Sequence, residues 1–259
     1  MPGRPLISLQ RVDKCFPSGV MALQGIDLQV EEREVVSLLG PSGCGKSTVL
    51  RLLAGLERAS AGVIDSPAAS AARTADTAFV FQDATLMPWA TVFDNVWLPL
   101  RLAGETRAAC DTRIRDVLHL VGLTGFENAY PAELSGGMRM RASIARALIT
   151  RPRVMLMDEP FAALDEFTRH KLNEDLLACW QTQQFTALFV THSVLESVFL
   201  SQRVLVMRSR PGRIVAEVRI DEQYPRSAAF RSSTRYIAAC EELTAALAEL
   251  NAPIDQVVR

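Results

Sequence analysis

The stretch GPSGCGKST, residues 40–48, has the residue types and spacing of a loop that binds phosphate. It fills the pattern GxxxxGK[ST] between an apolar segment and a helix-like one. Glycines let the backbone turn tightly and point its N–H groups inward, and the helix N-terminus adds partial positive charge. We expect Lys46 to reach the β- and γ-phosphates of a nucleotide and Ser47 to bind Mg²⁺. The expected nucleotide contacts are Gly40, Pro41, Ser42, Gly43, Cys44, Gly45, Lys46, Ser47 and Thr48.

Two acidic residues follow the apolar run in VMLMDEP, residues 154–160. A buried strand would deliver them to the carboxyl edge of a sheet, where such sheets bind ligands. There Asp158 would hold Mg²⁺, and Glu159 would be the general base for an attacking water. Considered without the phosphate loop, the two acids are equally consistent with merely capping the following turn, with Pro160 ending the strand.

Two further polar residues end predicted strands. His192 follows TALFVT (186–191), and Gln82 closes AFVFQ (78–82). His192 can hydrogen-bond a γ-phosphate and the attacking water, whereas the Gln82 amide can bind Mg²⁺ or position water. Each residue is a weak signal alone, but several strand ends that meet at one sheet edge form a stronger one.

A second glycine motif lies in LSGGMRMRASIARAL, residues 134–148. Ser135 is a residue type that caps helices, and Gly136 and Gly137 expose backbone N–H groups, so this motif should also bind phosphate. One chain cannot easily fold this helical region over its own phosphate loop. We therefore expect a second copy of the chain to supply the motif in a two-fold, head-to-tail arrangement.

The elements that must position these residues alternate along the chain, which predicts an α/β fold with a parallel sheet. A mainly helical block over 91–150 suggests an inserted lobe, and 57–77 suggests a surface loop or a weak strand pair. The predicted strands are 6–12, 22–30, 34–39, 78–82, 153–158, 186–191, 203–207 and 212–220, and the predicted helices are 46–56, 166–183 and 228–250.

The composition narrows the class of protein. The 259 residues are 49% hydrophobic, which suits one large domain or a core with a smaller lobe. A net charge of −1 with scattered charges gives no nucleic-acid footprint. Five cysteines without a CxxC pair indicate reduced thiols. We find no signal peptide and no stretch near 18 apolar residues, so any membrane role would need a partner.

Taken in order, the phosphate loop, the glutamine strand, LSGGM (134–138), VMLMDEP, ALD (163–165) and a later histidine resemble the ATP-binding subunit of an ABC transporter. The resemblance covers essentially the whole chain. It implies a P-loop NTPase (RecA-like) core, an N-terminal antiparallel β subdomain and an inserted α-helical subdomain. Residues 1–259 would form one ABC ATPase domain, with the nucleotide-binding core at 1–84 and 151–220, the helical subdomain at 85–150 and a C-terminal helical tail at 221–259.

The same resemblance implies cofactors and partners. Two subunits, most simply a homodimer, would enclose ATP and Mg²⁺ between the phosphate loop of one chain and Ser135, Gly136 and Gly137 of the other. Phe16 matches an aromatic residue that stacks on adenine, and Asp165 matches the acid of a loop that crosses the dimer. The segment after Gln82 would face integral membrane permease subunits at the cytoplasmic face of the membrane, and a periplasmic solute-binding protein would act indirectly. No nucleic-acid partner is expected.

Four segments carry a narrower resemblance, to the ATPases of taurine, sulfonate and nitrate importers. They are PFAALDEFTR (160–169), ATLMPWATVFDNVWLPL (84–100), SRPGRIV (209–215) and PRSAAFRSSTRYIAACEEL (225–243). Importers of pyrimidine vitamin precursors have similar ATPases, and a degenerate cassette that only binds ATP is a further alternative. ABC proteins of DNA repair or translation fit less well, because this chain has neither long coiled coils nor two cassettes.

Four positions depart from the pattern of the family: Arg33 replaces a glycine, Met140 a glutamine, and Ser193 and Gln202 aspartates. We expect Met140 to lose a polar contact that glutamine would make across the dimer. None of the four removes a phosphate ligand or the base, so an active ATPase is expected.

Three further expectations concern single side chains. We expect Trp89 to be as suited to an interface as to a core, and Trp97 to pack into the helical lobe. Cys44 lies at the start of a helix, which predicts a lowered thiol pKa and a site where alkylation blocks hydrolysis unless ATP protects it.

Overall fold

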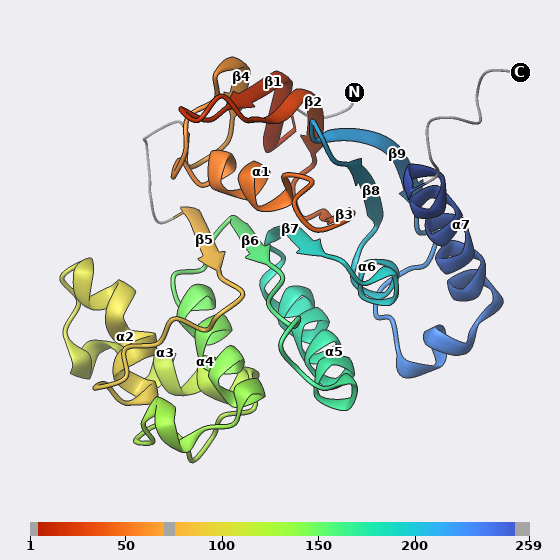
Figure 1. Cartoon of the computed structure of the whole chain (residues 1–259). Helices are drawn as coiled ribbons and strands as arrows, with labels where there is room; N and C mark the ends of the chain where they lie inside the picture. Colours follow the sequence, from red (N-terminus) through yellow and green to blue (C-terminus); the bar gives the residue numbers. More distant parts are fainter. Residues whose placement is uncertain (1–4, 70–75, 252–259) are drawn as a thin grey trace, which may run out of the picture.

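The computed structural model describes residues 5–69 and 76–251, and its centre is a six-stranded sheet (Figure 1). The strand order is β5-β6-β7-β3-β8-β9. All neighbouring strands are parallel except β8 and β9, which form an antiparallel hairpin. The predicted parallel sheet is confirmed. Its strands are β3 (Val35–Leu39), β5 (Thr77–Val80), β6 (Val154–Asp158), β7 (Thr186–Thr191), β8 (Arg203–Arg208) and β9 (Arg213–Arg219).

A second, antiparallel sheet has the order β2-β1-β4 and lies over helix α1 (Lys46–Leu53) (Figure 1). Its strands are β1 (Ile7–Cys15), β2 (Met21–Val30) and β4 (Ala61–Asp65). This sheet confirms the N-terminal antiparallel subdomain. The prediction of a loop or strand pair over 57–77 is right in part, because β4 pairs with β1. Residues 70–75 of that stretch lie outside the described residues.

The central strands are buried on both faces, which explains their continuous apolar sequences. In β3, Val35 and Leu39 belong to one core cluster, whereas Val36 and Leu38 belong to the other. The same alternation occurs in β6 and β7, because successive side chains of a strand point to opposite faces. One cluster contains α1 and the antiparallel sheet, and the other contains the remaining helices.

The other helices are α2 (Val92–Leu102), α3 (Arg107–Leu120), α4 (Gly136–Leu148), α5 (Glu166–Gln183), α6 (Val194–Leu200) and α7 (Thr234–Asn251), with 3-10 turns at Pro131–Glu133 and Ala228–Ser232. Helix α6 was not predicted, because seven largely buried residues are too short to show a helical apolar stripe. Within residues 5–69 and 76–251, no helix is long and apolar enough to cross a membrane.

The C-terminal helical segment packs against α6. Buried Arg226 donates hydrogen bonds to the carbonyls of Val198, Phe199 and Ser201, at the C-terminal end of α6. The Tyr236 hydroxyl donates to the Leu195 carbonyl. The bonds from Arg226 satisfy carbonyls that a helix end leaves without intrahelical partners. The tail is therefore attached to the element that directly follows His192.

Candidate nucleotide-binding site

The phosphate loop connects β3 to α1, as predicted. Gly43 and Gly45 have φ angles of 75° and 97°, a region in which other residues are strained. The turn between β8 and β9 lies directly against this loop. A Cβ atom on Gly212 would lie 2.2 Å from the Cys44 carbonyl oxygen, so only glycine fits there.

Lys46 is almost fully buried within the loop that it follows. Its Nζ donates hydrogen bonds to the carbonyls of Gly40 at 2.8 Å and Pro41 at 3.0 Å. The same Nζ lies 3.8 Å from Glu159 Oε1. The ammonium is thus held between the glycine-rich loop and an acidic strand end, where a phosphate group can compete for its donors.

Ser47 and Asp158 meet at the carboxyl edge of the sheet. The Ser47 hydroxyl donates to Asp158 Oδ1 at 2.8 Å. Burial raises the pKa of the Asp158 carboxyl, although the hydrogen bond from Ser47 opposes the shift. A carboxylate that is costly to desolvate, next to a hydroxyl oxygen, suits a hard divalent cation. In the described part of the chain, no group of three His, Cys, Asp or Glu could hold a metal ion.

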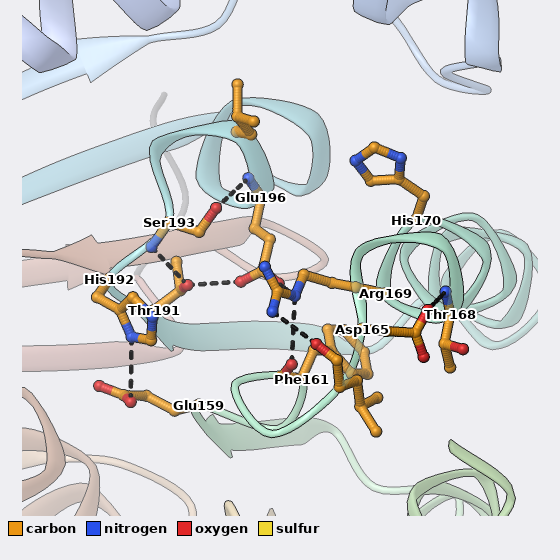
Figure 2. A network of polar contacts seen from close by, with 12 residues as sticks. Glu159, Phe161, Asp165, Thr168, Arg169, His170, Thr191, His192, Ser193 and Glu196 are labelled. Carbon is orange, nitrogen blue, oxygen red and sulfur yellow. Dashed lines mark hydrogen bonds and ion pairs between the residues drawn. The ribbon is translucent and has the colours of Figure 1, made fainter. Parts of the chain in front are cut away.

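Glu159 adopts a left-handed backbone conformation, with φ of 48°, at the end of β6. Its N–H donates to the Val190 carbonyl at 3.0 Å, which extends the pairing of β6 with β7. His192 ends β7 in the same way, and its Nδ1 lies 3.3 Å from Glu159 Oε2 (Figure 2). A left-handed backbone conformation such as that of Glu159 is strained. It persists only when surrounding contacts hold it, and such strain is concentrated at functional sites.

A cavity of about 510 Å³ lies over the phosphate loop. Phe16 and Gln82, both predicted, line it together with Glu159. Two further parts of the lining were not predicted from the sequence. One is Arg210, in the turn after β8, and the other is the start of β2. The motif SRPGRIV was noticed only as a family segment, and nothing in it indicated a place beside the phosphate loop. The missed residues are Val20, Met21, Ala22 and Arg210.

The second glycine motif lies at the start of α4, away from this cavity. Ser135 is the N-cap, and its Oγ accepts a hydrogen bond from the Met138 N–H at 3.2 Å. Ser135 and Gly136 are exposed, whereas Gly137 is buried. None of the three lines the cavity over the phosphate loop. The chain therefore brings together the residues on the strand ends but not the two glycine motifs.

Asp165 is also the N-cap of a helix, α5, and it accepts a hydrogen bond from the Thr168 N–H at 2.9 Å. This bond is the main reason that the pKa of the exposed Asp165 carboxyl is lowered. Phe167 follows in the first turn of α5 and is 85% exposed. An exposed acid and an exposed phenyl ring therefore stand together on this loop.

The expectation that the pKa of the Cys44 thiol is lowered is wrong. The side chain is fully buried, and burial raises the pKa of its thiol despite the nearby Lys46 ammonium. The sequence shows the helix N-terminus but not the packing beneath the loop. Desolvation of the thiolate therefore outweighs the electrostatic attraction.

We accordingly predict slow alkylation of Cys44. A raised thiol pKa lowers the thiolate fraction at pH 8, and the fold blocks access to the sulfur. Iodoacetamide should modify the half-buried Cys15 well before Cys44 in the folded chain, with or without Mg-ATP. Peptide mass mapping over time measures both sites, and equal rates at the two cysteines would contradict the prediction.

The loss of a polar contact across the dimer at Met140 stays a prediction. Only 4% of Met140 is exposed, and it belongs to the core cluster that contains α2 to α7. The Met140 side chain therefore packs inside its own chain. The sequence does not reveal this burial, because the exposed Gly136 lies only four residues earlier in the same helix.

The other departures have local explanations. Arg33 has φ of 65°, the left-handed conformation that a glycine adopts without strain. Ser193 is the N-cap of α6, and its Oγ accepts from the Glu196 N–H. Gln202 Oε1 accepts from the Val35 N–H at 2.8 Å, at the start of β3. Each of these residues thus has a structural role in the turn, helix end or strand start where it lies.

The fold and the site together are those of the P-loop nucleoside triphosphatases. The glycine-rich loop and Lys46 stand where a triphosphate would lie, and the strand ends beside them bring the carboxylates of Asp158 and Glu159. Residues 23–162 match the sequence profile of the family described as ABC transporter. The chain belongs to this family and is one of its ATP-hydrolysing cassettes.

Individual relatives agree with this assignment. The chain is 46% identical over 217 residues to the aliphatic sulfonates import ATP-binding protein SsuB 1 of Pseudomonas savastanoi, covering 83% of this chain and 86% of the relative. It is 46% identical to the taurine import ATP-binding protein TauB of Rhizobium johnstonii, covering 78% of each chain. Among solved structures, the dimeric cassette MJ0796 bound to ADP and Pi matches at 29% identity with a TM-score of 0.74, covering 84% of this chain and all of that one.

Proposed function

We propose that this chain is the ATPase subunit of an importer for a small anionic solute of the taurine, alkanesulfonate or nitrate type. The relatives named for sulfonate and taurine import support the solute class. The observation that carries the activity is the contact of Glu159, after β6, with both Lys46 at the start of α1 and His192 after β7. That arrangement places a candidate base beside the residue that would hold the γ-phosphate.

We assign the chemistry as follows. Lys46 and the loop N–H groups bind the phosphates, Phe16 stacks on adenine, and Glu159 accepts a proton from the attacking water while His192 orients it. Ser47, Asp158 and Gln82 would hold Mg²⁺, whose charge would stabilise the phosphates. Fixed donors around a phosphoryl group are the main catalytic contribution in this class of reaction.

We further propose that a second copy of the chain completes each site. Ser135, Gly136 and Gly137 are presented at an exposed helix N-terminus, which favours phosphate binding. Asp165 lies on an exposed loop that fits the crossing between the two chains. Closure of the pair around ATP, and its release after hydrolysis, would drive the membrane partner.

The proposed dock for a permease subunit lies between β5 and α2. A cavity of about 560 Å³ there is lined largely by apolar side chains, among them the exposed Phe81 and Leu102. Trp89 is 77% exposed on the adjoining loop, whereas Trp97 packs against the core, as predicted. Arg146 of α4 donates hydrogen bonds to the carbonyls of residues 84 and 85 and holds this loop. Such a dock would place the chain at the cytoplasmic face of the membrane.

Growth of a deletion strain tests the proposed solute. Without the gene, we expect loss of growth on taurine or an alkanesulfonate as sole sulfur source, or on nitrate as sole nitrogen source, and normal growth on sulfate and ammonium. The parent gene should restore growth, and Glu159→Gln should not. A requirement for a pyrimidine vitamin precursor instead would favour the alternative solute. Absence of phosphate release from the purified chain would favour a cassette that only binds ATP.

A further inference from the structure

Two side chains outside the proposed catalytic set connect the segment after Glu159 to the segment that carries His192. Arg169 lies in the first turns of α5, and Glu196 lies in α6. Arg169 Nε is 3.4 Å from Glu196 Oε1 (Figure 2). Neither residue lines the cavity over the phosphate loop.

Arg169 fixes the loop between β6 and α5. Its Nη2 donates to the Leu164 carbonyl at 2.7 Å, and its Nε donates to the Phe161 carbonyl at 3.3 Å (Figure 2). Phe161 comes two residues after Glu159 and is fully buried. The planar guanidinium can bind two carbonyls and a carboxylate at the same time, which an ammonium cannot do with the same geometry.

Glu196 bonds to the hydroxyl groups of the residues on both sides of His192, through its carboxylate on one side and its backbone N–H on the other. Its Oε2 accepts a hydrogen bond from the Thr191 hydroxyl at 2.5 Å, and its N–H donates to Ser193 Oγ at 3.3 Å. Thr191 Oγ1 also accepts from the Ser193 N–H at 2.9 Å. His192, which lies between these two residues, is therefore attached to Glu196 through each neighbour (Figure 2).

These contacts close a ring. The ring runs from Glu159 along the chain to Phe161, and then through Arg169 and Glu196 to Thr191 and His192. It returns to Glu159 through the 3.3 Å contact of His192 Nδ1 with Oε2. Since His192 is otherwise an exposed side chain at the end of a strand, this ring defines where it stands relative to the Glu159 carboxylate.

Because Glu196 is buried, removing either member of the pair should disturb the other. Glu196 is 5% exposed, and burial raises the pKa of its carboxyl, while Thr191 and Arg169 oppose the shift. Among the residues that the structure describes, Arg169 is the one basic side chain of lysine or arginine within ion-pair distance of Glu196. Loss of the guanidinium would therefore leave a buried carboxyl without its charge partner and would loosen both segments.

We propose that Arg169 and Glu196 act as a positioning pair that sets the place of His192 relative to the Glu159 carboxylate. The inference rests on the proposed roles of Glu159 and His192 in hydrolysis. It adds two residues that do not touch the nucleotide but determine how well the base and the histidine are aligned with it. Small displacements of such groups reduce turnover strongly.

The test compares kcat and KM for ATP in the purified full-length chain. Arg169→Met keeps the side-chain length and removes the guanidinium, so we expect kcat to fall about 10- to 100-fold with little change in KM. Arg169→Lys restores the charge but not the planar geometry and should recover part of kcat. Glu196→Gln should resemble Arg169→Met, and the double variant should be no slower than either single one, because the two act as a unit.

Arg203→Met is the matched control. Arg203 also binds a carboxylate, Glu34, and a backbone carbonyl, that of Gln29, but it lies at the opposite end of the sheet. It should lower the melting temperature and leave kcat unchanged. If Arg169→Met does not fold, Arg169→Lys and Glu196→Gln provide the same comparison.

The outcomes separate this inference from the proposed function. If Glu159→Gln is slow while Arg169→Met and Glu196→Gln keep the parent's kcat, the positioning pair is overturned and the proposed function stands. Losses that multiply in the double variant would also overturn the pair. If Glu159→Gln keeps the parent's rate, the proposed role of Glu159 fails first.

Discussion

Glu159→Gln is expected to slow ATP hydrolysis by about 10²- to 10⁴-fold, the usual contribution of a general base. Glutamine has nearly the same shape but cannot accept the proton of the attacking water. Because Lys46, Ser47 and the loop N–H groups are unchanged, the affinity for Mg-ATP should remain that of the parent. The variant should consequently accumulate as an ATP-bound dimer.

Phosphate release, nucleotide binding and size-exclusion chromatography in ATP measure these three effects. Glu217→Gln is a suitable control, because Glu217 lies on β9, pairs with Arg203 and does not line the nucleotide cavity. It should hydrolyse ATP at the parent's rate. Hydrolysis by Glu159→Gln at that same rate would mean that another group is the base.

Mixing two inactive variants is expected to restore hydrolysis. Lys46→Met removes the phosphate-binding ammonium, and Gly136→Asp places a negative charge where the second motif would meet a phosphate. An acid in the first turn of α4 is favourable for the helix, and a Cβ on Gly136 would lie 3.4 Å from Leu164 Cδ2, an ordinary contact. Gly136→Asp should therefore fold and yet fail to hydrolyse ATP.

In a mixed dimer, one site combines both defects and the other combines two intact halves. Random pairing at equal amounts should give about a quarter of the parent's activity, because half of the dimers are mixed and each has one intact site. A mixture no more active than its two components would argue that each chain uses its own second motif. The Glu217→Gln chain mixed with the parent should keep the parent's rate, which shows that mixing by itself does not change activity.

Local sequence motifs were sufficient to predict those parts of the site that are built from contiguous residues. The loop at 40–48 offers successive N–H groups to a phosphate, and its sequence implies this geometry. Asp158 and Glu159 could be assigned because an apolar run predicts a buried strand and the strand must end at a sheet edge. The observed strand order places these acids beside His192 and the phosphate loop, as the sequence predicted.

Burial could not be predicted from such motifs. Cys44 occupies a position that favours a thiolate, but packing under the loop raises the pKa of its thiol. Met140 is one turn from an exposed glycine, yet it points into the core. Neither burial could be predicted, since the exposure of one side chain depends on elements far away in the sequence.

The sequence by itself determined the glycine-rich loop, the acidic strand end and the α/β class, because each follows from residue types at short spacing. Only the tertiary structure decided that Arg210 approaches the nucleotide cavity and that Arg169 meets Glu196. These contacts join residues from separate elements, and their distances are set by how the sheet and helices pack. The local pattern thus identifies the chemistry, whereas packing determines which further side chains hold its groups in place.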